Sequence, residues 1–231
     1  MKTVGIIGGI GPESTIEYYR LILTGYRQRR PDTGSARIII NSVDLKRMLE
    51  LMAGTQMAAL TDYLAGEVHK LAVAGADFAL LASNAPHMVF NELRRRAMIP
   101  LLSIVEATCA VAKAQGFEKL GLFGARFTMM GRFYPEVFSR EGITIVAPQP
   151  TEQEYIHEKY LGELVNGIIK PETRHELLAI AARMKKRDGI EAVILGGTEL
   201  PLILPPDSAS DTPLLDTTRI HANAAVDWLL T

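Results

Sequence analysis

An internal repeat limits the folds open to this chain. The run VGIIGG, which begins at Val4, is similar to LGLFGA, which begins at Leu120. The run DFALLASN, which begins at Asp77, is similar to EAVILGGT, which begins at Glu191. Buried parallel strands share a common composition, so a single match of this kind is weak evidence. Two matches at nearly equal spacing, in two separate places, favour a duplicated unit.

Short apolar runs alternate with segments of helical periodicity along the whole chain. The apolar runs predict strands over residues 3–9, 36–43, 78–82, 101–105, 119–124, 143–147 and 192–195. The periodic segments predict a helix that begins at Pro12, and helices over 57–74, 87–96, 106–115, 128–140, 152–169, 172–187 and 218–230, with a Pro-rich loop over 200–213. Strands that alternate with helices indicate βαβ units and mostly parallel sheets.

We therefore predict an α/β protein with two pseudo-symmetric halves, each with a parallel sheet. The first half is expected to contain residues 1–101 and 208–231, and the second half residues 102–207. Ligands of open parallel sheets bind beyond the carboxyl ends of the strands. In two halves that face each other, those ends line one shared cleft, and the functional site is predicted there.

Charge and composition exclude several classes of function. The chain has 25 basic and 26 acidic residues, a balance that argues against a nucleic-acid binder dependent on phosphate neutralisation. It has no uninterrupted apolar run of about 20 residues, so no membrane-spanning helix is expected. The first apolar run is too short for a signal peptide, which favours the cytoplasm. Cys109 is the only cysteine, and the five histidines lack metal-ligand spacing, so no metal is predicted.

The loops after the predicted strands are rich in Gly, Ser, Thr and Asn, which suit a small anion such as a carboxylate. The glycine-rich run over residues 8–12 fits neither a dinucleotide fingerprint nor a phosphate loop. Ser83 follows a strand and is either a nucleophile or a hydroxyl that binds a ligand. Glu199 follows the matching strand and is either an acid/base or a carboxylate that accepts hydrogen bonds from nearby loops.

As a set, these motifs resemble the aspartate/glutamate racemase family. The resemblance rests on the run GIIGGIGPEST over 5–15, the loop with Asn84 and His87, and residues 124–129, 197–200 and 216–221, and it covers nearly the whole chain in order. It implies two pseudo-symmetric α/β halves, no pyridoxal phosphate, no metal and a homodimer. It also implies two opposed acid/base residues, usually cysteines, in the patterns Cys-Asn-Thr and Gly-Cys-Thr-Glu.

This chain departs from both patterns. Ser83 stands at the first cysteine position and Gly197 at the second. A thiol titrates near ~8.5, so its thiolate is accessible at neutral pH, whereas a hydroxyl is a much poorer base. Cys109 lies in a predicted helix and is expected to be a buried core residue. Proton transfer between two thiols is therefore not available to this chain.

Other positions match the family better. The resemblance implies that Asn84 and Thr198, helped by the backbone N–H groups of Ala85 and Glu199, hold an α-carboxylate. It implies a further hydroxyl from Thr128, and it makes Arg47 a candidate for binding a side-chain carboxylate. Gly9, His87 and Gly197 complete the predicted substrate-binding set.

Three functions remain open from the sequence. The first is a racemase or epimerase of a small, acidic amino acid, with Ser83 on one face and Thr198, Glu199 or an ordered water on the other. The second is a hydrolase or lyase of a small carboxylic acid that uses Ser83 or Glu199 alone. The third is a protein that binds small carboxylates without catalysis. All three predict a small carboxylic or amino acid as partner, and none predicts a cofactor, a nucleic acid or a membrane.

Overall fold

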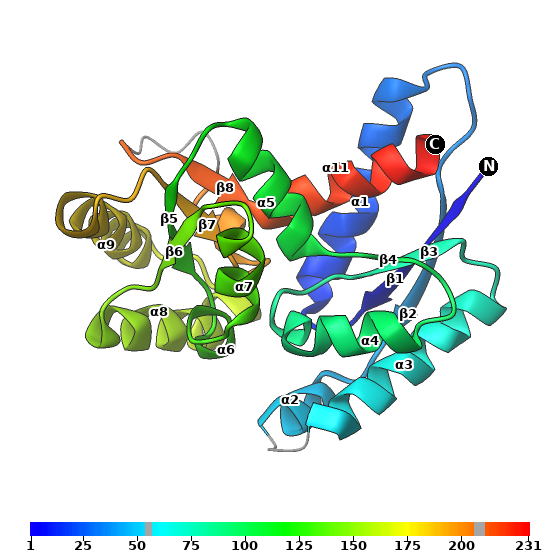
Figure 1. The fold of residues 1–231 in the computed structure, drawn as a ribbon, viewed down its shortest axis with the longest axis horizontal. Helices are drawn as coiled ribbons and strands as arrows, with labels where there is room; N and C mark the ends of the chain where they lie inside the picture. Colours follow the sequence, from blue (N-terminus) through cyan, green and yellow to red (C-terminus); the bar gives the residue numbers. More distant parts are fainter. Residues whose placement is uncertain (54–56, 206–210) are drawn as a thin grey trace. The chain divides into compact units, whose positions relative to one another are not determined.

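The computed structural model describes residues 1–53, 57–205 and 211–231. It divides into two compact units, Met1–Ile104 with Thr218–Thr231, and Val105–Thr217. Each unit has a four-stranded parallel sheet with helices between the strands (Figure 1). The predicted α/β class, with two similar halves, is confirmed.

The first unit is built on the strands β1 (Thr3–Gly8), β2 (Arg37–Ser42), β3 (Phe78–Leu81) and β4 (Leu101–Leu102). Their order in the sheet is β2-β1-β3-β4, and all neighbouring strands are parallel. Ile7 pairs with Asn41 on one side and with Leu81 on the other. The carboxyl ends of β1, β2 and β3 therefore lie at the same edge of the sheet.

Helices cover both faces of this first sheet, because side chains alternate along each strand. Val4 and Ile6 pack with α1 (Pro12–Arg29) and α11 (Thr217–Leu230). Ile7 packs on the other face with α2 (Leu45–Ala53), α3 (Met57–Val73) and α4 (Phe90–Arg96). A short 3-10 helix, η1 (Ala85–Val89), joins β3 to α4. The first unit thus has three layers, with the sheet in the middle.

The second unit repeats this topology. Its strands are β5 (Lys119–Phe123), β6 (Thr144–Val146), β7 (Ala192–Leu195) and β8 (Leu214–Asp216), in the parallel order β6-β5-β7-β8. Phe123 pairs with Leu195, as Ile7 pairs with Leu81 in the first unit. The strand order and this register confirm the repeat seen in the sequence.

The helices of the second unit are α5 (Ile104–Ala114), α6 (Arg126–Met129), α7 (Phe133–Ser139), α8 (Pro150–Gly162), η2 (Leu164–Asn166), α9 (Pro171–Asp188) and α10 (Leu200–Ile203). Phe123, Val193 and Leu195 pack with buried side chains of α8, α9 and α10. Helices α5 and α7 lie on the other side of the sheet (Figure 1).

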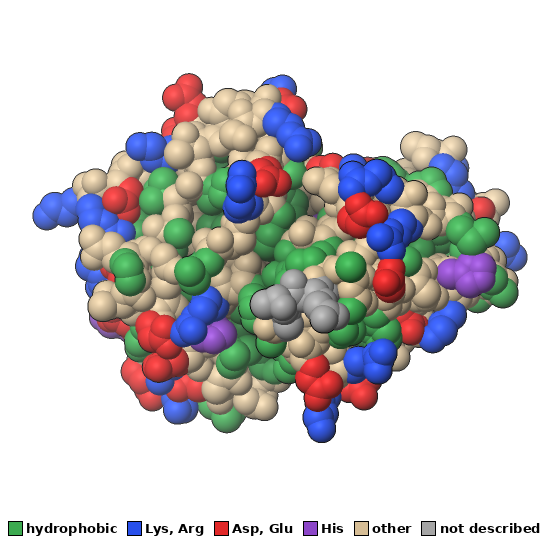
Figure 2. Space-filling model, turned by 60° about the horizontal axis from the view of Figure 1, so that its bottom comes forward, with side chains coloured by type: hydrophobic (Ala, Val, Ile, Leu, Met, Phe, Trp, Pro, Cys, Tyr) green, Lys and Arg blue, Asp and Glu red, His purple; other side chains and the backbone are tan. Residues whose placement is uncertain are grey.

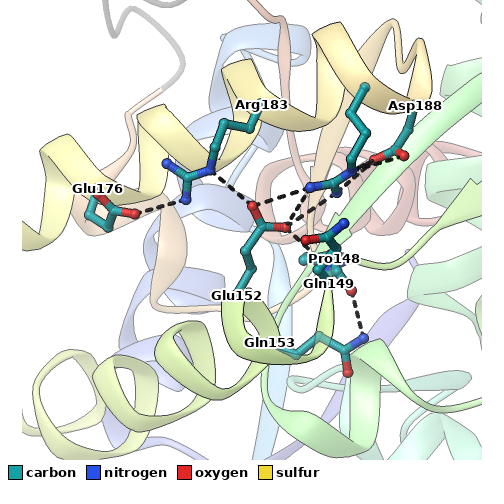
Figure 3. A network of polar contacts seen from close by, with 8 residues as sticks. Pro148, Gln149, Glu152, Gln153, Glu176, Arg183 and Asp188 are labelled. Carbon is teal, nitrogen blue, oxygen red and sulfur yellow. Dashed lines mark hydrogen bonds and ion pairs between the residues drawn. The ribbon is translucent and has the colours of Figure 1, made fainter.

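Helix α8 is fixed to α9 by a buried carboxylate. Glu152, in the first turn of α8, accepts a hydrogen bond from the backbone N–H of Gln149 at 2.9 Å and so closes a capping box. The same carboxylate forms ion pairs with Arg183 at 3.0 Å and with Arg187 at 3.3 Å, both on α9 (Figure 3). These contacts fix the orientation of α8, which carries a side chain of the candidate site.

Several expected elements differ in the structure. The helix expected over 128–140 is two helices, because the chain turns at Gly131, where a Cβ atom would lie 2.6 Å from the carbonyl oxygen of Phe127. The helix expected over 152–169 ends at Gly162. The strand expected over 101–105 stops at Leu102, because α5 already begins at Ile104.

The expected Pro-rich loop over 200–213 also differs. Its first residues form α10, and residues 206–210 lie outside the described part of the chain. The expected return to the first half at residue 208 falls in that gap. Beyond it, β8 pairs with β7, so residues 214–217 belong to the second unit. Neither β8 nor α2 was expected from the sequence.

Across the described residues, no helix is both long enough and apolar enough to span a membrane. Side chains of both charge signs are interspersed over the face shown in Figure 2, with no large area of one sign. This mixture agrees with the near-zero net charge of the chain.

Candidate functional site

The candidate site residues of the first unit follow the carboxyl end of β3. The backbone N–H of Ala82 donates to the carbonyl of Ile7 at 2.9 Å, so the chain stays beside β1 up to Ser83. Ser83 is 8% exposed and Asn84 is 3% exposed. Asn84 stands at the N-cap position of η1, and Ala85, half-buried, begins this short helix. Ser83, Asn84 and Ala85 therefore lie in succession at the carboxyl end of a central strand.

His87 is engaged with the protein's own backbone. Its Nε2 accepts a hydrogen bond from the backbone N–H of Ile104 at 3.3 Å, so its Nδ1 carries the proton and donates to the carbonyl of Ser83 at 3.1 Å. Burial, with a smaller effect from His221, lowers the pKa of His87 to about 3. Both ring nitrogens are occupied, so the ring fixes the position of Ser83 and has no nitrogen left for the substrate contact expected from the sequence.

His221 connects α11 with α1 and β4. Its Nδ1 accepts a hydrogen bond from the hydroxyl of Tyr18 at 2.8 Å, and its Nε2 donates to the carbonyl of Leu102 at 3.1 Å. Burial lowers the pKa of His221 to about 3, so the ring is neutral at physiological pH. His221 therefore has a packing role inside the first unit.

The loop after β1 depends on Gly9. Its φ of 81° lies in the left-handed region, and a Cβ atom there would lie 2.7 Å from the Ser42 hydroxyl and 2.8 Å from the Val43 nitrogen. Its backbone N–H donates to Thr15 Oγ1 at 3.0 Å. Gly9 therefore shapes the loop, and its N–H is already used.

Arg47 lies in the first turn of α2 and is exposed. Its guanidinium carbon is 5.1 Å from the centre of the Tyr63 ring, a cation–π contact. The structure therefore places Arg47 on the surface of the first unit, beyond the carboxyl end of β2.

The candidate residues of the second unit follow β7. The backbone N–H of Gly196 donates to the carbonyl of Phe123 at 2.7 Å, which keeps the chain beside β5 as Ala82 keeps it beside β1. Gly197, Thr198 and Glu199 then stand where the first unit has Ser83, Asn84 and Ala85. Thr198 is 5% exposed and Glu199 2% exposed. Thr198 Oγ1 donates a hydrogen bond to Glu199 Oε2 at 2.9 Å.

Tyr160, on α8, joins this second set and was missed in the sequence analysis. Its hydroxyl donates a hydrogen bond to Glu199 Oε2. A Cβ atom on Gly197 would lie 2.9 Å from the Cζ atom of Tyr160 and 3.1 Å from its hydroxyl oxygen. Burial, with the charge of Glu199, raises the pKa of Tyr160 well above its ordinary value. The sequence gives only one signal for this contact, the glycine at position 197. That glycine does not indicate which side chain lies where its own side chain would be.

Thr128 packs beneath the same set. It is 1% exposed, and its Cβ lies 3.0 Å from the position that a Cβ on Gly124 would take. Its methyl carbon lies 2.9 Å from the corresponding position on Gly196. The small size of both glycines therefore lets Thr128 lie against the tips of β5 and β7.

Within the described part of the chain, no group of three or more His, Cys, Asp or Glu side chains is arranged to hold a metal ion. Cys109 is 3% exposed in α5, which confirms its expected place in the core. Burial, with a smaller effect from Glu141, raises the pKa of its thiol to about 11. The thiol is therefore protonated at neutral pH and is no substitute for a catalytic cysteine.

The chain has two parallel α/β units, and each has buried polar residues after its third strand in chain order. In this fold and in these strand ends the chain is similar to the α/β racemases. Residues 7–225 match the family described as Asp/Glu/hydantoin racemase. The chain belongs to the Asp/Glu/hydantoin racemase family, which confirms the resemblance seen in the sequence.

Individual relatives agree with this assignment. The chain is 33% identical to a Yersinia pestis protein provisionally described as an Asp/Glu racemase, with a TM-score of 0.91 over the full length of both chains. It is 29% identical to an aspartate racemase homologue from Pyrococcus horikoshii OT3, with a TM-score of 0.86, again over both full chains. It is 23% identical to the broad specificity amino-acid racemase RacX of Bacillus subtilis, over 98% of each chain.

Proposed function

We propose that this chain is a cofactor-independent amino-acid racemase-like isomerase that moves the α-proton of a small, acidic amino acid. One observation carries the proposal: a chain of the Asp/Glu/hydantoin racemase family keeps buried polar side chains at matching positions in both units. Ser83 and Asn84 follow β3, and Thr198 and Glu199 follow β7. A racemase must act on both faces of one carbon, and two equivalent strand ends suit that requirement.

The proposed roles follow from the chemistry of each group. Asn84 and Thr198, with the backbone N–H groups of Ala85 and Glu199, bind the α-carboxylate. Donors of this kind stabilise the negative charge that develops as the α-proton leaves. Arg47 binds the side-chain carboxylate, because a guanidinium can bind a carboxylate with two parallel hydrogen bonds. Gly9, Thr128, His87 and Gly197 shape the loops that carry these groups.

The acid/base roles are assigned to Ser83 for the first unit and to Thr198 and Glu199 for the second. Neither unit has a thiol, so each proton transfer depends on a weaker acid/base than in relatives with a cysteine pair. We therefore expect slow turnover at neutral pH.

Deuterium wash-in tests the proposal. Each enantiomer of aspartate and of glutamate is incubated with the protein in heavy water, and the loss of the α-proton signal is followed by NMR. We expect exchange for at least one of them, and a loss of exchange in Ser83→Ala. No exchange with any of the four would contradict the proposed function.

A second candidate is supported by the absence of a side chain at 197. With Ser83 or Glu199 acting alone, the same residues could hydrolyse or cleave a small carboxylic acid, since such reactions need only one competent group. Product formation without α-proton exchange would favour this candidate over racemisation.

We also infer that the protein acts as a homodimer in the cytoplasm, without a metal or pyridoxal phosphate. Light scattering after size-exclusion chromatography measures the mass, and a value near 25.4 kDa would contradict the dimer. Activity after dialysis against a chelator tests the independence from metals, and a loss that added metal restores would contradict it.

A further inference from the structure

The backbone conformation at residue 197 would allow a side chain, but a neighbouring ring leaves no space for one. Gly197 is not among the glycines with positive φ, so its backbone conformation suits other residues. A Cβ atom there would nevertheless collide with the ring of Tyr160, 2.9 Å from Cζ. The ring of Tyr160 therefore takes the place of the side chain that residue 197 lacks.

Tyr160 also brings an acid/base group to that place. Its hydroxyl oxygen is 3.1 Å from the Cβ position of residue 197, so it lies beside the volume that a side chain at 197 would occupy. The hydroxyl donates to Glu199 Oε2, which also accepts from Thr198 Oγ1 at 2.9 Å. Since both contacts are donated to the same oxygen, Glu199 acts as the acceptor in a buried chain of hydrogen bonds.

The helix that carries Tyr160 is held firmly on both sides of it. Glu152 at the start of α8 is paired with Arg183 and Arg187 on α9. Glu163, directly after α8, is paired with Lys159 at 2.8 Å and accepts a hydrogen bond from Thr173 at 2.6 Å. A group that transfers protons needs a fixed position, and these contacts supply one.

We propose that Tyr160 and Glu199 together form the proton-transferring pair of the second unit, in the place of the missing side chain at residue 197. This inference rests on the proposed function and names the group that acts on one face of the substrate. Glu199 was assigned to that face from the sequence, and Tyr160 is the new catalytic residue.

The transfer balances without any further reagent. The bond between the α-carbon and its hydrogen breaks, and the proton passes to the hydroxyl oxygen of Tyr160. The phenol's own proton passes at the same time to Glu199 Oε2, so the carboxylate becomes a carboxylic acid. The electron pair stays on the substrate as a carbanion stabilised by its carboxylate. The reverse movement of both protons returns a proton to the same face.

This relay avoids a free tyrosinate. Burial and the charge of Glu199 raise the pKa of Tyr160 well above its ordinary value, so the phenol stays protonated at neutral pH. The net base is then the Glu199 carboxylate, and Tyr160 carries the proton between it and the substrate. The pair serves one face only, so the two enantiomers are expected to exchange at different rates.

The test compares Tyr160→Phe with Tyr155→Phe. Each variant removes one hydroxyl from α8 and keeps the ring, and Tyr155 is a partly buried residue outside the candidate site. The exchange of the α-proton in heavy water is measured for L- and D-aspartate and L- and D-glutamate, with kcat and KM for each. Melting temperatures establish that both variants are folded.

For Tyr160→Phe we expect kcat for α-proton exchange to fall about 100-fold or more for at least one enantiomer of the substrate. We expect KM to change less than about threefold, because the hydroxyl acts in the transition state more than in binding. Tyr155→Phe should keep both rates within about twofold. A second variant, Tyr160→Ala with Gly197→Cys, should exchange faster than Tyr160→Ala alone, because it frees the site for a thiol.

The outcomes separate the two proposals. If the unaltered protein exchanges the α-proton and Tyr160→Phe keeps that rate within about threefold, the role of Tyr160 is overturned and the proposed function stands. A raised KM with an unchanged kcat would show that Tyr160 supports substrate binding only, and would also overturn its role. No exchange by the unaltered protein with any of the four amino acids would overturn both.

Discussion

The ring of Tyr160 lies where a side chain on Gly197 would begin, with Cζ 2.9 Å from the Cβ position. The two residues are therefore coupled: Tyr160 fits because residue 197 is glycine, and a side chain at residue 197 would collide with the ring of Tyr160. Each of them can be changed alone or together with the other, so the coupling is measurable.

Gly197→Ala should lower the free energy of unfolding by about 1–3 kcal/mol, the usual cost of overpacking a buried site. The same change in a Tyr160→Ala background should cost much less, because the ring is gone. A double-mutant cycle in urea measures the difference as a coupling energy. Additive effects of the two substitutions would contradict the contact between these residues.

Gly9→Ala should destabilise the first unit. Its φ of 81° costs an L-residue about 1–2 kcal/mol, and the new Cβ would also meet Ser42 and Val43. Gly66→Ala is the matched control, since Gly66 lies inside α3 with no heavy atom within 4 Å of its Cβ position. That change should stabilise the protein by about 0.5–1 kcal/mol. Equal effects of the two substitutions in thermal or urea unfolding would contradict the loop conformation described for Gly9.

The buried pair His87 and His221 should make the protein sensitive to acid. Both have a pKa of about 3 in the folded chain, against an ordinary value of 6.5. Between pH 6.5 and pH 3, these histidines therefore bind protons in the unfolded chain but not in the folded chain. The stability that they contribute is fully present above pH 6.5 and is lost as the pH falls toward 3.

Each of these histidines should contribute a slope of about 1.4 kcal/mol per pH unit in that window. His221→Asn should reduce the slope measured by urea unfolding at pH 6 to 4, although it lowers stability at pH 7 by removing the contacts to Tyr18 and Leu102. An unchanged slope would show that His221 takes up a proton in the folded protein.

Ser83 should limit the rate of proton transfer in the first unit. Ser83→Cys places a thiol there, whose pKa near ~8.5 is far closer to neutral than that of a hydroxyl. We expect faster α-proton exchange in Ser83→Cys, by about tenfold or more, and slower exchange in Ser83→Ala. A rate that does not distinguish serine, alanine and cysteine would remove residue 83 from the chemistry.

Much of the fold could be predicted because buried parallel strands carry a local signal. The apolar runs at Thr3–Gly8, Phe78–Leu81, Lys119–Phe123 and Ala192–Leu195 were all expected as strands, and the spacing of the repeat correctly matched Ser83 with Gly197. The strand β8 gave no such signal. β8 has three residues, and it is a strand because β7 provides a partner for its backbone.

Side-chain partners were harder to foresee. His87 was expected to bind substrate, yet its ring nitrogens are used by Ser83 and Ile104. The first contact lies within one loop, but the second depends on how β4 and α5 return past η1. Hydrogen bonds between residues far apart in the chain are fixed by packing, and a local pattern does not encode them.

The amino-acid sequence alone established a duplicated α/β chain of the racemase family, and it established that neither unit has a cysteine at its strand end. These conclusions depend on residue identity and spacing, which are local properties. The packing of α8 against β7 decided that Tyr160, with Glu199, occupies the place left empty at Gly197. That contact joins two elements through the core of one unit, so it exists only once the whole unit has folded.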